Sequence, residues 1–338
     1  MPTLADVARA AGVSVSVVSR ILNNDPRLRA REDTRDRVKA VASQLGYMPN
    51  HAARALRLSH AETVSLVVPD ATNPIFSEMF RGVEDEADIA GLQVLLGQSL
   101  DLRPDSNLLR RLVDQGRVDG FVLQVSARQE VHEAEQAIAD RVPVVLIHAR
   151  GQRRGSVILD DEGAAQLATE HLLALGHTDI AMVSGPVPAQ TASRREKGYA
   201  RAMSEAHVRR RPTWTVKAGY SPEAGRQAAR HLLSKPRRPT AMVVANINAA
   251  LGVLKGARES KVSVPDELSV VAIHDTWLAT TTFPELTTVR MPLYQMGREG
   301  VRQLIARLSG QRPEDVVITD PPPVLVERES TAEAPRRR

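Results

Sequence analysis

The sequence contains no cysteine among its 338 residues, which excludes disulfide bonds and thiolate metal sites and is compatible with a reducing cytoplasm. Aromatic residues make up only 3% of the chain. No stretch approaches the roughly 18 consecutive apolar residues of a membrane-spanning helix, and no basic segment followed by an apolar run marks the N-terminus for secretion. We therefore expect a soluble, cytoplasmic protein without a membrane partner.

Motifs of the common enzyme classes are also missing. The sequence has no G-x-x-x-x-G-K-[ST] phosphate loop, no G-x-G-x-x-G that opens a helix after a strand, and no H-E-x-x-H or G-x-S-x-G. Its nine histidines are scattered, and the spacing of His171 and His177 favours packing or capping over metal ligation. The sequence predicts no enzyme, no cofactor and no metal site.

Positive charge is concentrated at the start of the chain. Residues 1–60 hold ten basic and five acidic side chains, which accounts for the whole formal net charge of +5. The length predicts two or three structural units, and 42% hydrophobic residues suffice for a substantial core. A small basic unit supplies the salt-sensitive, sequence-independent part of DNA affinity, although an ordinary solvated surface has the same composition.

The stretch 3–22 predicts two short helices joined by a tight turn. Thr3 and Asp6 form a capping-box pattern, Gly12 ends the first helix, and Ser14 caps the second. The apolar positions of the two helices recur at helical spacing: Leu4, Val7, Ala8 and Ala11, then Val17 or Val18, Ile21 and Leu22. This arrangement favours a helix-turn-helix, whose second helix enters the DNA major groove, with a plain helical hairpin as the alternative.

A third helix over 34–45, ended by Gly46, allows a miniature core of three helices. Pro49-Asn50 then begins an Ala-rich segment of barely two turns, up to Leu56, which is marginal as a helix by itself. The segments Leu4–Ser14, Val18–Asn23 and Gly46–Asn50, followed by Ala53-Arg54 and Leu56, together resemble the DNA-binding head and hinge of the lactose/galactose repressor family (LacI/GalR).

The resemblance implies roles for individual residues. Base contacts fall on Val15, Ser16 and Arg20; phosphate contacts fall on Thr3, Ser19 and Asn23; and hinge contacts fall on Asn50, Ala53 and Leu56. Leu56 corresponds to a wedge that enters the minor groove and kinks the duplex. Val17 stands where the family usually has Thr, and the loop 24–33 is longer than usual.

After the polar connection 57–63, buried apolar strands alternate with helices, which indicates parallel sheets covered by helices. The expected strands are 64–69, 93–97, 120–124, 142–147, 180–184, 213–217, 241–245, 268–273 and 324–327. The expected helices are 77–90, 108–115, 131–139, 160–175, 194–206, 223–233, 249–259 and 296–308. Two similar α/β halves with a cleft between them follow from this order.

The family resemblance extends over residues 2–328 and implies a two-lobed core with the periplasmic-binding-protein type 1 fold. The motifs that carry it are Val68-Pro69-Asp70, Asn73-Pro74-Ile75-Phe76, Val118-Asp119-Gly120, His171–His177 and Pro284–Val289. The expected organisation is as follows: an all-α head at 1–48, hinge helix and linker at 49–62, a core at 63–328 and a disordered tail at 329–338. Within the core, lobe 1 spans about 63–159 and 290–321, and lobe 2 about 160–289 and 322–328.

By the same resemblance, a small effector binds in the cleft. Its contacts are expected from Asn73, Ile75, Phe76, Arg195, Tyr220, Asn246, His274 and Asp275. Arg195 offers a planar donor fork, and Asn246 both donates and accepts. Alternatively, Arg195 pairs with a neighbouring acid and Asp275 caps a turn. His274 and Ile247 stand where the family often has Asp, so acceptors for sugar hydroxyls are lost and an anionic or less polar effector gains support.

The sequence thus predicts a DNA-binding transcription regulator, by resemblance a repressor, with double-stranded operator DNA and a small-molecule effector as partners. A homodimer is expected, with a tetramer as the alternative. The rival interpretation is a solute-binding protein or enzyme that carries a helical N-terminus, and a secretion signal would favour it.

Overall fold

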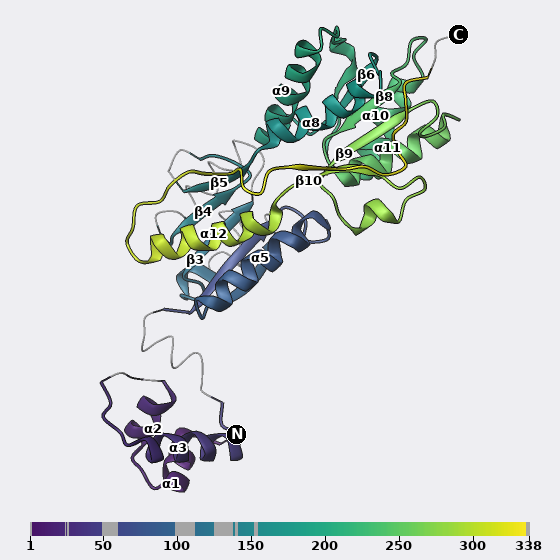
Figure 1. Cartoon of the computed structure of the whole chain (residues 1–338). Coiled ribbons are helices and arrows are strands. Elements are labelled where there is room, and N and C mark those ends of the chain that lie inside the picture. Colours follow the sequence, from purple (N-terminus) through teal and green to yellow (C-terminus); the bar gives the residue numbers. More distant parts are fainter. Residues whose placement is uncertain are drawn as a thin grey trace. The chain divides into compact units, whose positions relative to one another are not determined.

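The computed structural model describes residues 2–23, 25, 27–48, 60–98, 112–124, 138, 141–151 and 155–335. The chain divides into two compact units, Met1–Ala61 and Glu62–Arg338. Both units are drawn in Figure 1. The hinge residues Asn50, Ala53 and Leu56 lie outside the described residues.

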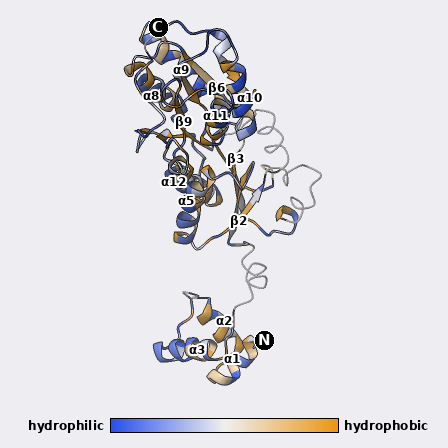
Figure 2. Ribbon diagram, turned by 90° about the vertical axis from the view of Figure 1, so that its right-hand side faces the viewer, coloured by the Kyte–Doolittle hydropathy of each residue, from blue (hydrophilic) through white to orange (hydrophobic). Residues whose placement is uncertain are grey.

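The first unit is helical, as predicted. Its helices are α1 (Leu4–Ala11), α2 (Val15–Leu22) and α3 (Glu32–Gln44). They enclose a small core of buried side chains: Val7, Ala8, Ala11, Val18, Ile21, Val38 and Ala42. In Figure 2, α2 is largely hydrophobic and α3 largely hydrophilic. The core is therefore supplied by one face of each helix.

Local capping explains the ends of these helices. The Asp6 N–H donates to Thr3 Oγ1 (3.3 Å) and the Thr3 N–H donates to Asp6 Oδ2 (2.9 Å), which completes the predicted capping box. Gly12 ends α1 at φ +67°, in the left-handed region that glycine enters without steric cost. Helix α3 begins at Glu32, two residues before the predicted start, because two acidic residues occupy its first turn, where the helix dipole favours them.

The second unit contains two lobes, each built on one six-stranded sheet. The sheet of lobe 1 has the order β11-β5-β4-β3-β1-β2, and all its neighbours are parallel. Its strands are β1 (Thr63–Val68), β2 (Gln93–Gln98), β3 (Gly120–Gln124), β4 (Val144–Ile147), β5 (Ser156–Leu159) and β11 (Val316–Ile318). Helices α5 (Ile75–Ile89) and α12 (Leu293–Leu308) lie side by side against it (Figure 1).

The sheet of lobe 2 repeats this plan with the order β12-β10-β9-β8-β6-β7. Its strands are β6 (Ile180–Ser184), β7 (Thr215–Lys217), β8 (Ala241–Val244), β9 (Ser269–Ile273), β10 (Thr287–Arg290) and β12 (Val324–Val326). Only β12 is antiparallel to its neighbour among the paired strands described. The helical elements of the lobe are α8 (Asp161–Ala174), α9 (Gln190–Glu205), η2 (Pro212–Trp214), α10 (Pro222–Leu233), α11 (Ile247–Glu259) and η3 (Trp277–Thr280).

The two sheets confirm the predicted two-lobed, parallel α/β core. The chain passes from lobe 1 to lobe 2 between β5 and α8, returns between β10 and α12, and crosses again between β11 and β12. Strands β5, β10 and β11 were not predicted, and most of the expected helices 108–115 and 131–139 lie outside the described residues. Among the described residues, no helix has the length and apolarity needed to cross a membrane.

The tail is ordered further than predicted. Residues 329–335, expected to be disordered, lie against lobe 2. Ser330 is fully buried and donates its hydroxyl to the Val270 carbonyl (2.6 Å), and the Ala334 N–H donates to the Leu175 carbonyl (2.8 Å). Two predicted packing histidines, His171 and His177, hydrogen-bond this segment at Thr331 and Ala332. The backbone of a short polar segment is thus satisfied by lobe 2.

Candidate functional site

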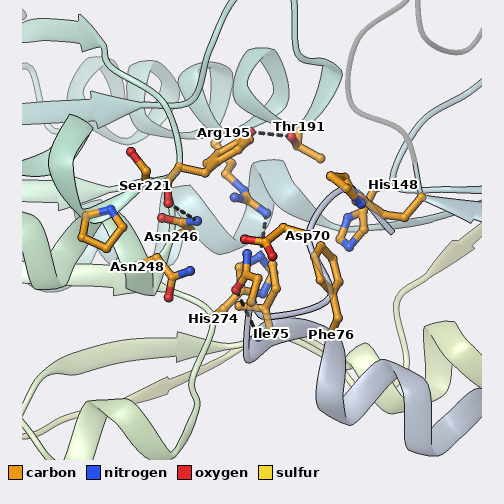
Figure 3. A pocket seen from close by; sticks show the side chains of 15 residues that line it. Asp70, Ile75, Phe76, His148, Thr191, Arg195, Ser221, Asn246, Asn248 and His274 are labelled. Atoms are coloured by element: carbon orange, nitrogen blue, oxygen red, sulfur yellow. Dashed lines mark hydrogen bonds between the residues drawn. The ribbon is translucent and has the colours of Figure 1, made fainter. Parts of the chain in front are cut away.

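A cavity of about 240 Å³ lies where the carboxyl ends of strands from both lobes meet. Lobe 1 supplies Pro69, Asp70, Asn73, Ile75, Phe76, Gln124 and His148. Lobe 2 supplies Thr191, Arg195, Tyr220, Ser221, Pro222, Asn246, Asn248 and His274. Open α/β sheets bind ligands at this edge. The cavity is the candidate effector site, and Figure 3 shows its lining.

Arg195 is the buried cation of the cavity, with only 2% of its surface exposed. Its Nε donates to Asp161 Oδ1 (2.8 Å), Nη1 donates to the Ala245 carbonyl, and Nη2 lies 2.9 Å from His274 Nε2. The neighbouring Arg194 donates twice to Asp161 Oδ2, at 2.9 and 2.7 Å. Arg195 therefore faces the cavity with its charge already paired, as the alternative interpretation of the sequence allowed.

Asp161 holds both arginines in place and is itself fully buried. Burial alone would raise the pKa of this carboxyl, but the charges of Arg195 and then Arg194 outweigh it, so the pKa lies below its ordinary value. The acidic run 160–162 was interpreted as a helix N-terminus, and Asp160 does cap α8 by accepting from the Gly163 N–H (2.8 Å). Its neighbour Asp161 instead organises the cavity.

Asn246 and Tyr220 are fixed by contacts within lobe 2. Asn246 caps α11 by accepting from the Ala249 N–H (2.8 Å) and donates to the Tyr220 carbonyl (3.1 Å). The Tyr220 hydroxyl lies 2.7 Å from Thr191 Oγ1. The Tyr220 ring packs over Gly185, where any side chain would overlap it. Burial raises the pKa of Tyr220, so the phenol stays protonated. These contacts hold one wall of the cavity rigid.

Two buried histidines face each other across the lobes. His148 directly follows β4 and His274 directly follows β9, and these strands hold equivalent places in the two sheet orders. Both residues are in the left-handed region, at φ +65° and +71°. Their ring centroids lie 6.3 Å apart in an edge-to-face arrangement. Burial lowers the pKa of His148 to about 4 and that of His274 well below its ordinary value, so both rings are neutral. Backbone strain at equivalent positions of a cavity indicates a functional role.

Seven of the eight predicted effector contacts line the cavity: Asn73, Ile75, Phe76, Arg195, Tyr220, Asn246 and His274. Asp275 is not brought into this lining. Its carboxylate accepts from Thr288 (2.8 Å), Arg290 (2.7 Å) and Arg328 (2.8 Å) instead. His148 was not among the predicted contacts, although its position directly after the expected strand 142–147 would have placed it at the ligand-binding edge of the sheet. Among the described residues, no group of three or more potential ligands is arranged to hold a metal ion.

Hydrogen bonds also join the lobes beside the cavity. The side chain of Gln190, at the start of α9, accepts from the Arg150 N–H (3.1 Å) and donates to the Arg150 carbonyl (2.9 Å). Arg194 donates across the lobes to the His148 carbonyl (2.7 Å). A change in the angle between the lobes must break or re-form these contacts.

In the head, the predicted base-reading side chains lie on the outer face of α2. Val15, Ser16 and Arg20 are exposed, whereas Val18 and Ile21 are fully buried on the inner face. Arg20 Nε lies 3.4 Å from Asp25 Oδ2 in an ion pair at the surface of the head. If Arg20 binds DNA, a contact with the DNA must replace this ion pair. The predicted phosphate contacts Thr3, Ser19 and Asn23 are exposed or half-buried.

Known protein families match both the head and the core. The model of the bacterial regulatory proteins, lacI family, matches residues 3–50, and that of the periplasmic binding protein-like domain matches residues 169–331. The HTH-type transcriptional regulator DegA of Bacillus subtilis is 32% identical over 98% of each chain. The HTH-type transcriptional repressor PurR of Erwinia tasmaniensis is 30% identical over 100% of this chain and 99% of that one.

Among solved structures, the lac repressor dimer bound to operator and the anti-inducer ONPF superimposes with a TM-score of 0.82. It is 28% identical, and the match covers 98% of this chain and 99% of the repressor chain. The curated relatives are transcription regulators rather than enzymes. A helix-turn-helix head and a two-lobed, effector-type core, shared with such regulators along nearly the whole sequence, place this chain in the LacI family of DNA-binding transcription regulators.

Proposed function

We propose that this protein represses transcription by binding an operator through α2, and that a small metabolite in the cavity of the core sets its affinity for that operator. The observation that carries the proposal is the outer face of α2. This face exposes Ser16 and Arg20 beside Val15, and it belongs to a unit with its own core. Residues 1–60, which include this unit, also carry the whole net positive charge of the chain. Such a face fits the major groove.

On the operator, Val15, Ser16 and Arg20 contact bases. Thr3, Ser19 and Asn23 contact phosphates, which sets the orientation of the head. The hinge residues Asn50, Ala53 and Leu56 complete the interface, with Leu56 inserted into the minor groove to kink the duplex. A kinked duplex makes more contacts than a straight one, so the hinge and α2 stabilise the same bound state.

The effector acts through the angle between the lobes. Its contacts come from the predicted residues of the lining, and they join lobe 1 to lobe 2 beside the Gln190 and Arg194 bridges. A ligand shifts an equilibrium only by its difference in affinity for the two states. Contacts with both lobes supply that difference, because opening the cavity breaks one set of them.

The working form is a homodimer. Lobe 1 exposes Ile89, Leu95 and Leu96, and lobe 2 exposes Trp277 and Phe283. Phe283 is 97% exposed and Trp277 67% exposed, and an association surface that covers them would bury apolar area. Two heads on one near-palindromic operator follow from twofold symmetry. Since its partner is DNA, we assign the protein to the cytoplasm.

Selection from a random-sequence duplex library tests the proposal. The full chain should enrich one near-palindromic site, and deletion of residues 1–60 should abolish retention. Arg20→Ala should relax the preference at one base pair in each half-site, at a cost of about 1–3 kcal/mol. Arg9 is the matched control, because its side chain is 80% exposed on α1 rather than on the reading face of α2. Arg9→Ala should weaken all duplexes alike. No enrichment by the intact protein, with or without metabolite mixtures, would reject the proposal.

A further inference from the structure

The proton on the His274 ring has only one place to be. Its Nε2 atom lies 2.9 Å from Arg195 Nη2. Guanidinium nitrogens only donate hydrogen bonds, so Nε2 must be the acceptor and carries no proton. The ring is neutral, because a charged ring would place a second donor and a like charge against the guanidinium. A neutral imidazole keeps one proton, which therefore sits on Nδ1.

This Nδ1–H is a buried donor beside the cavity. His274 has 1% of its surface exposed, and Nδ1 has no hydrogen-bond partner in the described part of the chain. Native proteins pair nearly all buried polar groups, and an unpaired one in a cavity points to a ligand. Figure 3 shows His148 and His274 projecting toward the cavity from opposite lobes.

The acceptors that contact Arg195 or cap α11 at this wall of the cavity are already engaged. Each Asp161 oxygen accepts from an arginine, and the Ala245 carbonyl accepts from Arg195. Asn246 Oδ1 accepts from the backbone at Ala249. A hydroxyl group placed at Nδ1 would accept its proton, but it would bring a proton of its own, which would occupy the one acceptor left among these groups, a ring nitrogen of His148. A group without a proton avoids that cost.

We infer that the effector places a proton-free acceptor, the oxygen of a carbonyl or carboxylate group, on His274 Nδ1. The inference rests on the proposed function and names the chemistry of its effector. His148 extends the same site from lobe 1, since both of its ring nitrogens are buried without partners among the described residues. One ring nitrogen of His148 donates and the other accepts, so it can meet a second polar atom of the same ligand. The effector thereby bridges equivalent positions of the two lobes.

Nitrogen NMR on the full chain labelled with ¹⁵N-histidine tests the first step without any effector. The His274 signals, identified by their loss in His274→Asn, should report a neutral ring with the proton on Nδ1 at pH 7. A proton on Nε2, or an imidazolium at pH 7, would overturn the inference. The result does not depend on DNA binding, so it stands or falls separately from the proposed function.

Fragment probes test the acceptor preference. Acetate and acetamide should each be able to shift the His274 Nδ1 signal, and ethane-1,2-diol should not. A response to acetate alone identifies a carboxylate effector, and a response to acetamide alone identifies a neutral carbonyl. A response to the diol alone, or to none of the three, would contradict the inference.

Two matched variants separate the ring nitrogens. In His274→Asn the side-chain amide keeps a donor near the Nδ1 position, whereas in His274→Gln it keeps an acceptor for Arg195 near the Nε2 position. Binding of the responding probe, followed by thermal shift, should weaken about tenfold in the Gln variant, the factor for loss of one hydrogen bond. It should be retained in the Asn variant. Weaker probe binding in the Asn variant than in the Gln variant would reject the Nδ1 donor. If either variant fails to fold, the NMR measurements on the labelled native chain test the donor instead.

Discussion

At the scale of single residues, the chemistry of the cavity is set by pairs that are far apart in the sequence. Asp161 holds Arg194 and Arg195, and Arg195 in turn orients His274. Breaking a buried pair by removing one partner costs about 3–5 kcal/mol. The positions of these side chains are therefore fixed before any ligand arrives, and pre-organisation of this kind reduces the ordering cost of binding.

Stability should fall in mild acid because of the buried histidines. Burial lowers the pKa of His148 to about 4, against about 6.5 in an unfolded chain. Between these values the unfolded chain binds a proton that the folded chain excludes, so this contribution is complete above pH 6.5 and is lost as the pH falls toward 4. Urea unfolding at pH 7 and pH 5 should show that His148→Gln removes about 2 kcal/mol of the difference between the two conditions. An unchanged difference would contradict a neutral, buried His148.

The sequence predicted seven residues that line the cavity, but not the hydrogen bonds between them. Residues placed by the family motifs, such as Phe76 and Asn246, do line it. The partners of Arg195 were open, because nothing in a single sequence joins residue 161 to residue 195 and then to residue 274. Asp275 was expected beside His274 in the lining, but adjacent residues leaving a strand point in different directions, and Asp275 faces Thr288 and Arg328 instead.

At the scale of elements, helix pairs in both lobes meet through glycine. In lobe 1, a side chain at Gly297 of α12 would overlap the Met79 carbonyl oxygen of α5, and one at Gly82 would overlap the Tyr294 carbonyl oxygen. In lobe 2, Gly198 of α9 and Gly252 of α11 make similarly close approaches to the backbone of α8 and α10. The backbones are thus packed more closely than side chains would allow, and the helices cannot separate without losing that contact.

Replacement of these glycines by alanine should lower the free energy of unfolding most where the new Cβ would overlap backbone atoms. Gly297→Ala must displace α5, whereas Gly300→Ala on the same helix meets a side-chain atom, Val122 Cγ1, at 3.2 Å. Both substitutions gain the same helix propensity, about 1 kcal/mol, so the comparison isolates packing. Gly297→Ala should be less stable than Gly300→Ala by about 3 kcal/mol in denaturant unfolding. Equal stabilities would show that α5 and α12 can shift apart freely.

Sequence patterns predicted the long, fully buried strands and the amphipathic helices well, and failed at some short strands and at the tail. Strand β3 was predicted with its observed bounds, Gly120–Gln124. Strands β5, β10 and β11 have three or four residues and are not separated from a neighbouring strand in the chain by a described α-helix. They therefore lie outside the alternation of strands and helices that indicated equally short strands such as β8. The tail looked disordered because its residues are polar, yet Ser330 and its neighbours bond to lobe 2. Contacts of this kind join residues about 60 positions apart, so no local sequence pattern predicts them.

At the scale of the whole molecule, the net positive charge is confined to residues 1–60. The basic head faces a polyanion, and beyond residue 60 acidic and basic side chains balance. Affinity for nonspecific duplex should therefore fall with salt through the head alone. The exposed aromatic residues Trp277 and Phe283 lie on the core. If the core associates as proposed, DNA contact and association are carried by different units of one chain, and the core sets how many heads reach an operator.

The proposed dimer gives the last prediction. Phe283→Asp places a charge on a 97% exposed apolar ring of the surface proposed for association, so it should yield monomers in sedimentation velocity. Operator affinity should fall at least about a hundredfold, because one head then binds without the high effective concentration that a tethered second head provides.

Val187→Asp is the control, since Val187 is also exposed on lobe 2, at 64%, but lies in the loop before α9. It should remain dimeric and bind the operator normally. If Phe283→Asp stays dimeric while its fold is intact, the association surface lies elsewhere. If it is monomeric but keeps full operator affinity, one head alone supplies the affinity, and the twofold arrangement on the operator is wrong.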